Sequence, residues 1–308
     1  MDNVLKNMRE TPIESEEQHA KPDDALTGTD DRSDGNVYET INSLHMYLGL
    51  HYPRSGKDKN VDPIFPHDHA PWHAVGFPQR VARLLISLIP KNEEFPKRAL
   101  DIGCAVGGSS FELAKVFGKV DAFDYSESFV KAAKQLQANE VIRFQIPVEA
   151  ELYEEVTVVY DEDVTEEVRQ RVHFFTGDAC SLQDMVEKGL LSGHESYDGV
   201  LSANLLCRLP EPMACLNDLP KIVRKEGVVV IVTPFSWLCE FTPRERWLGG
   251  FIDPLTNESV YSKTALQTVM EKNGFEKIHE EQVPLLIREH QRKYQYIVSE
   301  ATGWRKVK

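Results

Sequence analysis

The stretch ALDIGCAVGGSSFELA, residues 99–114, decides the fold of this chain. Its first residues are typical of a short buried strand, the glycine-containing segment after them of a tight turn, and the remainder of the first turns of a helix. An acidic residue, Asp124, follows 21 residues after Gly103, at the end of a second apolar segment. This order of strand, glycine turn, helix, strand and carboxylate predicts a βαβ unit that binds a nucleoside.

The spacing of the glycines distinguishes between two nucleoside cofactors. A dinucleotide-binding fold uses Gly-x-Gly-x-x-Gly, so that backbone amides can approach a pyrophosphate. Counted from Gly103, the second glycine position holds Ala105, while the last holds Gly108. S-adenosylmethionine has no phosphate, and the acidic Asp101 suits its cationic sulfonium and amino-acid tail. We therefore expect S-adenosylmethionine as cofactor and S-adenosylhomocysteine as product, and Ala105 disfavours a nicotinamide-dependent oxidoreductase.

Two later apolar segments also end in polar residues. Residues 172–180, VHFFTGDAC, predict a buried strand that ends at Asp178, where a carboxylate can meet the adenine amino group. Residues 197–206, YDGVLSANLL, predict a strand with Asn204 at its C-terminal edge. Open α/β sheets bind ligands at this edge, so we expect Asp124 to bind the ribose hydroxyls there. The candidate cofactor-binding residues are Tyr38, Arg80, Asp101, Gly103, Cys104, Gly107, Asp124, Tyr125, Ser126, Asp178, Ala179 and Asn204.

The composition fits a soluble globular protein, with 41% hydrophobic and 27% charged residues among 308. The formal net charge is −14, and residues 1–36 hold ten acidic and four basic residues without apolar periodicity, which predicts a disordered acidic leader. An acidic chain without a basic stripe disfavours nucleic acid and anionic membranes as partners. No run approaches a transmembrane span. Five cysteines without paired spacing indicate a reducing compartment, and we expect a cytoplasmic protein.

The remaining pattern predicts one class I methyltransferase domain over residues 37–308, a doubly wound, mostly parallel sheet that ends in an antiparallel hairpin. An N-terminal helical cap and loop are expected at 37–98, and an insertion with a hairpin and a short helix at 142–171. In the last helix we expect Ser262 as N-cap. Helices are expected at 37–50, 77–90 and 262–273, and strands at 172–176, 198–203, 227–233, 282–288 and 293–301.

Four motifs carry a resemblance to a known family. They are residues 101–114, residues 204–210 (NLLCRLP), residues 237–250 (WLCEFTPRERWLGG) and residues 288–304. Through these motifs, and nearly everywhere from Val37 onward, the chain resembles the methyltransferase domain of ovothiol biosynthesis, the thiohistidine (mercaptohistidine) N-methyltransferase family. Methyltransferases in general share only the first motif. The resemblance implies methyl transfer from S-adenosylmethionine to the imidazole π nitrogen of 5-thiohistidine, which gives ovothiol, with no metal.

In many members of that family this domain follows an iron-dependent sulfoxide synthase in one polypeptide. Here the iron-binding pattern His-x-x-x-His-x-Glu is incomplete, because Val75 stands where the glutamate would follow His69 and His73. The resemblance therefore implies a stand-alone form whose substrate comes from a separate sulfoxide synthase. The cluster of His67, His69 and His73 has the ligand types for a metal. Because methyl transfer to nitrogen needs none, we expect a loop-packing or substrate-lid role for it.

The acceptor in this reaction is a small zwitterion, which defines the residues to look for. Its carboxylate favours an arginine fork, for which Arg288 is the first candidate and Arg208 the second. An imidazole titrates at about pH 6.5, so much of it already has a free lone pair and no strong base is required. We expect Asn204, His51 and Tyr47 as catalytic residues. The substrate-binding candidates are Tyr52, Arg208, Trp237, Glu240, Phe241, Thr242, Trp247 and Arg288.

Two alternatives stay open at this point. The aromatic-rich segment 235–247 also suits another small acceptor, such as histidine or a different thiol. The chain could instead be a non-catalytic partner that binds S-adenosylmethionine and supports a separate sulfoxide synthase.

Overall fold

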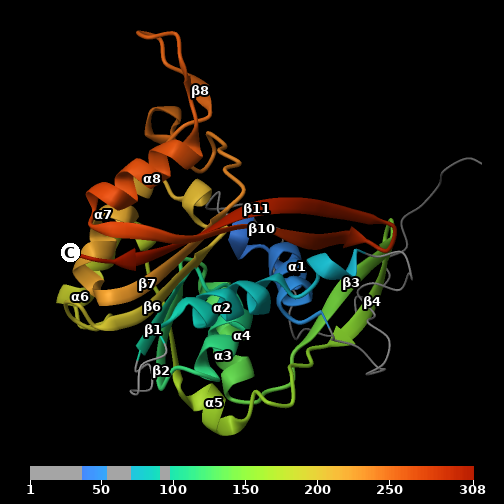
Figure 1. Ribbon diagram of the computed structural model, residues 1–308. Helices are drawn as coiled ribbons and strands as arrows, with labels where there is room; N and C mark the ends of the chain where they lie inside the picture. Colours follow the sequence, from blue (N-terminus) through green and yellow to red (C-terminus); the bar gives the residue numbers. More distant parts are fainter. Residues whose placement is uncertain (1–36, 54–70, 91–97) are drawn as a thin grey trace, which may run out of the picture.

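A seven-stranded sheet forms the centre of the protein in the computed structural model, which describes residues 37–53, 71–90 and 98–308 (Figure 1). The strand order is β10-β11-β7-β6-β1-β2-β5. Neighbours from β7 to β5 are parallel, whereas β11 is antiparallel to both β7 and β10. The strands are β1 (Arg98–Ile102), β2 (Lys119–Asp124), β5 (Val172–Thr176), β6 (Tyr197–Ala203), β7 (Val223–Thr233), β10 (Phe275–His290) and β11 (Lys293–Lys306).

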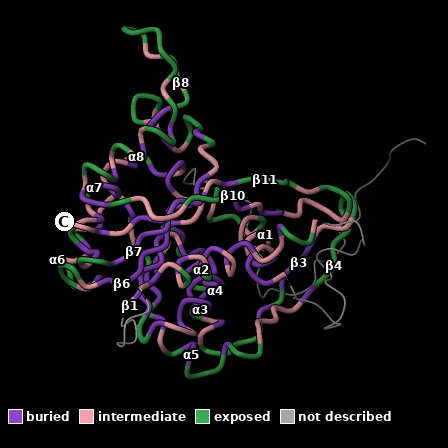
Figure 2. Tube along the Cα trace, in the orientation of Figure 1, coloured by how far each residue is buried: buried purple, intermediate pink, exposed green. Residues whose placement is uncertain are grey.

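Helices cover both faces of this sheet, which confirms the predicted class I methyltransferase fold. On one face lie α1 (Ile41–His51), α2 (Phe77–Leu88), α3 (Gly108–Ala114) and α4 (Glu127–Gln137). On the other lie α6 (Leu182–Glu187), α7 (Pro212–Ile222) and α8 (Ser262–Lys272). The short α5 (Glu166–Gln170) precedes β5. The buried trace in Figure 2 follows the sheet between these two layers.

Strand β7 shows why its sequence forms a central strand. Val228, Val230 and Val232 pack into the core on the α2 face, while Val229 and Ile231 pack into the core on the α7 face. Successive side chains of a strand point to opposite faces, so a strand between two helical layers is apolar throughout. Because the side chains on both faces of β7 are buried against helices, the strand lies in the middle layer of the fold.

Two hairpins extend the structure beyond the C-terminal edge of the parallel strands. Strand β11 pairs with β7 only from Glu300 to Arg305, so residues 293–299 and their partners in β10 project past that edge. The insertion forms a second hairpin, β3 (Arg143–Glu149) with β4 (Leu152–Thr157), and both hairpins contact α1 (Figure 1). The short β8 (Phe251–Ile252) and β9 (Ser259–Val260) form a separate hairpin that stands away from the body.

Several expected boundaries differ from the observed ones. The C-terminal strands are longer than expected, because each continues along the sheet as well as in the projecting hairpin. Ser262 is not the N-cap of α8; Tyr261 holds that position, and the Ser262 hydroxyl accepts a hydrogen bond of 2.8 Å from the Trp237 indole. The leader expected at 1–36 lies outside the described residues. Among the helices that are described, none is long and apolar enough to cross a membrane.

Candidate active site

The glycine turn after β1 forms the floor of the candidate cofactor site. Gly103 and Gly107 have φ angles of 76° and 87°, in the left-handed region that favours glycine. A Cβ atom on Gly103 would also lie 3.0 Å from the Leu205 side chain. The amides of Gly103 and Cys104 donate to the Phe123 carbonyl at 2.9 and 3.0 Å, which joins this turn to the end of β2. The cysteine contributes through its backbone, since its thiol is buried.

Asp124, at the end of β2, faces this turn. One carboxylate oxygen accepts from the Ala105 amide at 2.9 Å, and the other from the Ser126 amide at 2.9 Å. These bonds hold the carboxylate in place, and each oxygen keeps a further lone pair for a ribose hydroxyl. Burial raises the pKa of Asp124 to about 6, so the carboxylate is ionised at neutral pH.

Asp101 places a second carboxylate beneath the turn. It is 1% exposed, and one of its oxygens accepts from the hydroxyls of Ser109 and Ser110 at 2.7 and 2.6 Å. Burial raises the pKa of Asp101 to about 6 as well. With Asp124, it gives this edge of the sheet a negative field that favours a cationic ligand.

The next strand ends complete the cofactor side. Asp178 caps the 3₁₀ turn Ala179–Ser181 by accepting from the Cys180 amide at 2.8 Å, and Ala179 is buried behind it. Tyr125 leaves the end of β2 with 70% of its surface exposed. Ser126 caps α4 and is buried, so its side chain positions the helix rather than facing solvent. Asp178 and Tyr125 therefore offer a carboxylate and an aromatic ring at the same edge.

Asn204 follows β6 at the centre of that edge. Its φ angle of 53° turns the chain away from the sheet, and its amide donates to the Val232 carbonyl at 2.8 Å. The Ser299 hydroxyl, on the projecting part of β11, donates to Asn204 Oδ1 at 2.8 Å. Because Oδ1 is the acceptor of this bond, the Asn204 side chain has its NH₂ group to offer to a ligand.

An aromatic enclosure lies beside these strand ends. The Tyr38 ring centroid is 6.1 Å from that of Tyr47 and 5.9 Å from that of Phe241, and Tyr47 packs on Phe129 at 4.8 Å. The Arg208 guanidinium lies over the Phe241 ring, 4.8 Å from its centroid. Burial raises the pKa of the Tyr38 hydroxyl, while its hydrogen bond with Arg208 opposes that rise. The N-terminal segment and the loop after β7 thus both contact the Arg208 guanidinium.

Arg208 is oriented by carbonyl groups. Its guanidinium donates to the Ser236 carbonyl at 2.7 Å and to the Cys207 carbonyl at 3.1 Å. Within residues 37–53, 71–90 and 98–308, no carboxylate forms an ion pair with it. A guanidinium fixed in this way can bind a carboxylate ligand with two parallel hydrogen bonds.

Sequence comparison then decides the family. A methyltransferase domain profile matches residues 74–280, which is more than half of the chain. The chain belongs to the methyltransferase domain family. None of the curated proteins compared with this methyltransferase matches it significantly.

Solved structures share the methyltransferase fold at low sequence identity. Magnesium protoporphyrin IX methyltransferase from Synechocystis PCC 6803, with bound S-adenosylhomocysteine, is 16% identical and gives a TM-score of 0.51, covering 90% of this chain and 100% of that chain. The [4+2]-cyclase SpnF is 13% identical with a TM-score of 0.52, covering 88% of this chain and 94% of that chain. These two proteins differ in activity, so the likeness establishes the fold alone.

The residues of this methyltransferase fit S-adenosylmethionine. The turn carries Ala105 where a pyrophosphate would require glycine, and the carboxylates of Asp101 and Asp124 both bind residues of the turn or of the helix that follows it. Gly103, Asp124, Tyr125 and Asp178 are the residues that would hold the cofactor. In the part of the chain that the structure describes, no group of three His, Cys, Asp or Glu side chains is arranged to hold a metal. His67 and His69 lie outside the described residues, and His73 contacts the Tyr296 hydroxyl at 3.2 Å.

Two predicted site residues at the end of α1 contact the turn from behind. His51 Nδ1 accepts from the Gly108 amide at 3.0 Å, and the Tyr52 hydroxyl donates to the Val106 carbonyl at 2.8 Å. Burial lowers the pKa of His51 to about 3, so its ring is neutral with the proton on Nε2. A general-base role for His51 does not agree with this environment, because Nδ1 is already an acceptor and the ring resists protonation.

Other predicted acceptor residues have their polar atoms bound within the methyltransferase. The indole of Trp237 donates to Ser262, and the indole of Trp247 donates to the Thr242 carbonyl at 2.8 Å. The hydroxyl of Thr242, which is fully buried, donates to the Leu209 carbonyl at 2.7 Å. Glu240 is exposed. These side chains stabilise the loop after β7, and of this loop only Phe241 enters the aromatic enclosure.

The two other predicted arginines bind backbone carbonyls of neighbouring elements. Arg80 donates to the carbonyls of Val75 and Pro284, so it links α2 to β10. Arg288 donates to the Pro147 carbonyl at 2.8 Å, near the tip of the projecting hairpin. It pairs with Tyr294, five residues before Ser299, which places it roughly 16 Å along the strand from the Asn204 contact. Arg208, the second candidate, is the arginine that the fold brings to the enclosure.

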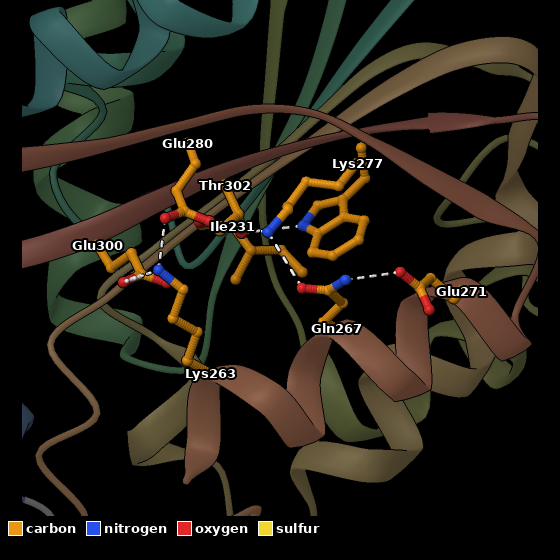
Figure 3. A network of polar contacts seen from close by, with 9 residues as sticks. Ile231, Lys263, Gln267, Glu271, Lys277, Glu280, Glu300 and Thr302 are labelled. Atoms are coloured by element: carbon orange, nitrogen blue, oxygen red, sulfur yellow. Dashed lines mark hydrogen bonds and ion pairs between the residues drawn. The ribbon is translucent and has the colours of Figure 1, made fainter.

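Sequence reasoning missed the contribution of Ser299. It is fully buried, and its position depends on the register of β11. A network between α8 and the hairpin supports that register (Figure 3). Lys263 binds Glu280 and, at 3.1 Å, Glu300, the residue after Ser299. In the same network Lys277 binds Glu280 at 2.8 Å and Gln267 at 3.1 Å.

Proposed function

We propose that this methyltransferase transfers the methyl group of S-adenosylmethionine to the imidazole π nitrogen of 5-thiohistidine, and so produces ovothiol. The observation that carries the proposal is Arg208, a guanidinium without a carboxylate partner among the described residues, which lies over the Phe241 ring in the aromatic enclosure. An aromatic amino acid has the matching groups, a carboxylate for the guanidinium and a ring for the aromatic walls. The resemblance in residues 204–210 and 237–250 narrows that class to thiohistidine.

Each side chain of the enclosure has a defined role in this proposal. Arg208 binds the carboxylate, Phe241 and Tyr47 contact the ring, and the Asn204 NH₂ group donates to the acceptor. Burial raises the pKa values of Tyr38 and Tyr47, so both hydroxyls remain protonated donors at neutral pH. The acceptor nitrogen brings its own lone pair, and the site need not remove a proton from it.

The cofactor supplies an electrophilic methyl group when it is bound. The carbon–sulfur bond breaks with its electron pair on sulfur, a carbon–nitrogen bond forms, and the positive charge passes to the imidazole ring. The protein holds the nitrogen at about 3–3.5 Å from the methyl carbon and excludes water, and this positioning supplies most of the acceleration. The carboxylates Asp101 and Asp124 stabilise the cation near the turn.

The test is mass spectrometry of the purified protein with S-adenosylmethionine and thiohistidine, with histidine as the control substrate. We expect a product one methyl group heavier from thiohistidine alone, with the π nitrogen identified by NMR. Methylation of histidine at an equal rate would contradict specificity for thiohistidine and indicate a broader range of substrates. Tight binding of S-adenosylhomocysteine without product from either substrate would favour the non-catalytic partner.

A further inference from the structure

The N-terminal described segment, residues 37–52, joins the two turns that form the cofactor site. We call it the strap; it comprises the 3₁₀ turn Val37–Glu39 and helix α1. Thr40 caps α1 by accepting from the Ser43 amide at 3.2 Å, which connects the two parts. The two ends of the strap are on the order of 20 Å apart, by the rise of a helix. Each end makes its own hydrogen bonds to a different turn.

The C-terminal end of the strap binds the glycine turn. The Tyr52 hydroxyl donates to the Val106 carbonyl at 2.8 Å, and His51 Nδ1 accepts from the Gly108 amide at 3.0 Å. Both side chains are at least 95% buried. The Gln79 side chain of α2 donates to the His51 carbonyl at 2.7 Å and fixes the end of the helix. Two adjacent residues therefore hold the backbone on which the cofactor would lie.

The N-terminal end of the strap binds the turn after β2. One Glu39 carboxylate oxygen accepts from the Glu127 amide at 2.9 Å, and the other accepts from the Ser128 amide at 3.3 Å and from its hydroxyl. The Tyr38 carbonyl accepts from the Ser126 hydroxyl at 3.3 Å. A carboxylate on the first amides of α4 is favoured by the helix dipole. This attachment lies two to four residues from Asp124 in sequence, and it places Tyr38 in the aromatic enclosure.

We infer that the strap retains the cofactor, and that Glu39 and Tyr52 are positioning residues that hold the two cofactor turns together through it. The geometry favours this over simple packing, because the three side chains of Glu39, His51 and Tyr52 bind either the glycine turn or the first residues of α4, directly after the turn that follows β2. Exchange of cofactor for product then requires release of at least one end. This inference concerns the cofactor and does not depend on which acceptor is methylated.

The test measures the affinity for S-adenosylhomocysteine by calorimetry in Glu39→Gln, Tyr52→Phe and the double variant. In Glu39→Gln the side-chain amide turns a donor toward a backbone N–H, and Tyr52→Phe leaves the Val106 carbonyl without its donor. We expect each to weaken binding about tenfold or more. Substitutions at two sites this far apart normally reduce the affinity by factors that multiply in the double variant. We expect the double variant to bind about as weakly as the weaker single variant, because releasing either end already frees the strap.

Two matched controls separate this role from general stability. Glu127→Gln removes the same charge at the same helix end, from an exposed side chain, and Tyr153→Phe removes the same hydroxyl from an exposed position on β4. Both should bind like the wild type. Hydrogen exchange should show that S-adenosylhomocysteine protects residues 37–52, and protects them less in either strap variant. Unchanged affinity with a lowered Tm would overturn the inference, and so would losses that simply multiply in the double variant.

Discussion

Ser299 donates a hydrogen bond of 2.8 Å to Asn204 Oδ1, although 95 residues separate the two in sequence. The bond crosses from the last strand of the sheet to the residue that ends β6. It occupies Oδ1 of the Asn204 carboxamide and leaves the NH₂ group as the part that can bind a ligand.

Removal of that hydroxyl should therefore impair turnover more than cofactor binding. In Ser299→Ala, Asn204 Oδ1 loses its donor and the carboxamide is free to rotate. We expect kcat for thiohistidine methylation to fall about tenfold, with the dissociation constant of S-adenosylhomocysteine changed less than about twofold. Initial rates and calorimetry measure the two quantities. Ser87→Ala, which removes a hydroxyl whose one hydrogen bond among the described residues goes to the Leu84 carbonyl, serves as control.

Replacement of Arg208 should affect the acceptor alone. Arg208→Lys keeps the charge but loses the planar fork, and we expect the KM for thiohistidine to rise about 10- to 100-fold. The affinity for S-adenosylhomocysteine should remain that of the wild type. Arg246→Gln, an arginine of the same region that pairs with Glu211, should change neither value. An unchanged KM in Arg208→Lys would remove the carboxylate-binding role.

Ionisation of Asp101 should lower the stability of the cofactor-free protein. Burial raises its folded pKa to about 6 from an ordinary value of 3.8, so between these values the folded state binds more protons than the unfolded state. Its contribution therefore favours folding below pH 3.8 and is lost as the pH rises to about 6. We expect Asp101→Asn, which can still accept from both serines, to raise the Tm at pH 7.5. At pH 5 the gain should be smaller, and thermal melts at both values check this.

Cofactor affinity should fall as the pH falls, whereas the stabilising contribution of Asp101 increases. An ionised Asp124 accepts ribose hydroxyls best, and burial raises its pKa to about 6. Binding of S-adenosylhomocysteine should therefore weaken as the pH falls from 7.5 to 5. In Asp124→Asn we expect affinity at pH 7.5 to fall about 10- to 100-fold. The pH dependence should flatten in this variant, and a persistent slope would assign the titration to another group.

The gathering of polar residues at the strand ends could be predicted from sequence because each of them is placed by local pattern. Asp101, Asp124, Asp178 and Asn204 each lie near the end of an apolar strand or just after it, and parallel strands place their C-terminal ends at one edge. The fold could be predicted from little more than these strand ends and the βαβ spacing. Among the cofactor candidates, packing placed Arg80 elsewhere, on carbonyls of two other segments.

The acceptor half depends on contacts that no local pattern contains. Arg208, Phe241 and Tyr38 meet because the 3₁₀ turn Leu206–Arg208, the loop after β7 and the N-terminal segment converge. Arg288 was the first candidate for the carboxylate, but the length by which the hairpin projects could not be read from its alternation. Tryptophan is common in binding sites, yet the indoles of Trp237 and Trp247 stabilise their own loop. For Ser299, a single serine in a strand gives no signal at all.

Because β11 inserts between β7 and β10, the sheet is completed out of chain order. During synthesis, a chain that has emerged as far as β10 already contains every turn that faces the cofactor, but Asn204 still lacks Ser299. A chain of that length would also lack the strand that covers the edge of β7 and the buried Trp304, so the last strand completes both the core and the contact to Asn204. Catalytic competence would then be the last property that the emerging polypeptide gains, and it would be governed by the docking of a single strand.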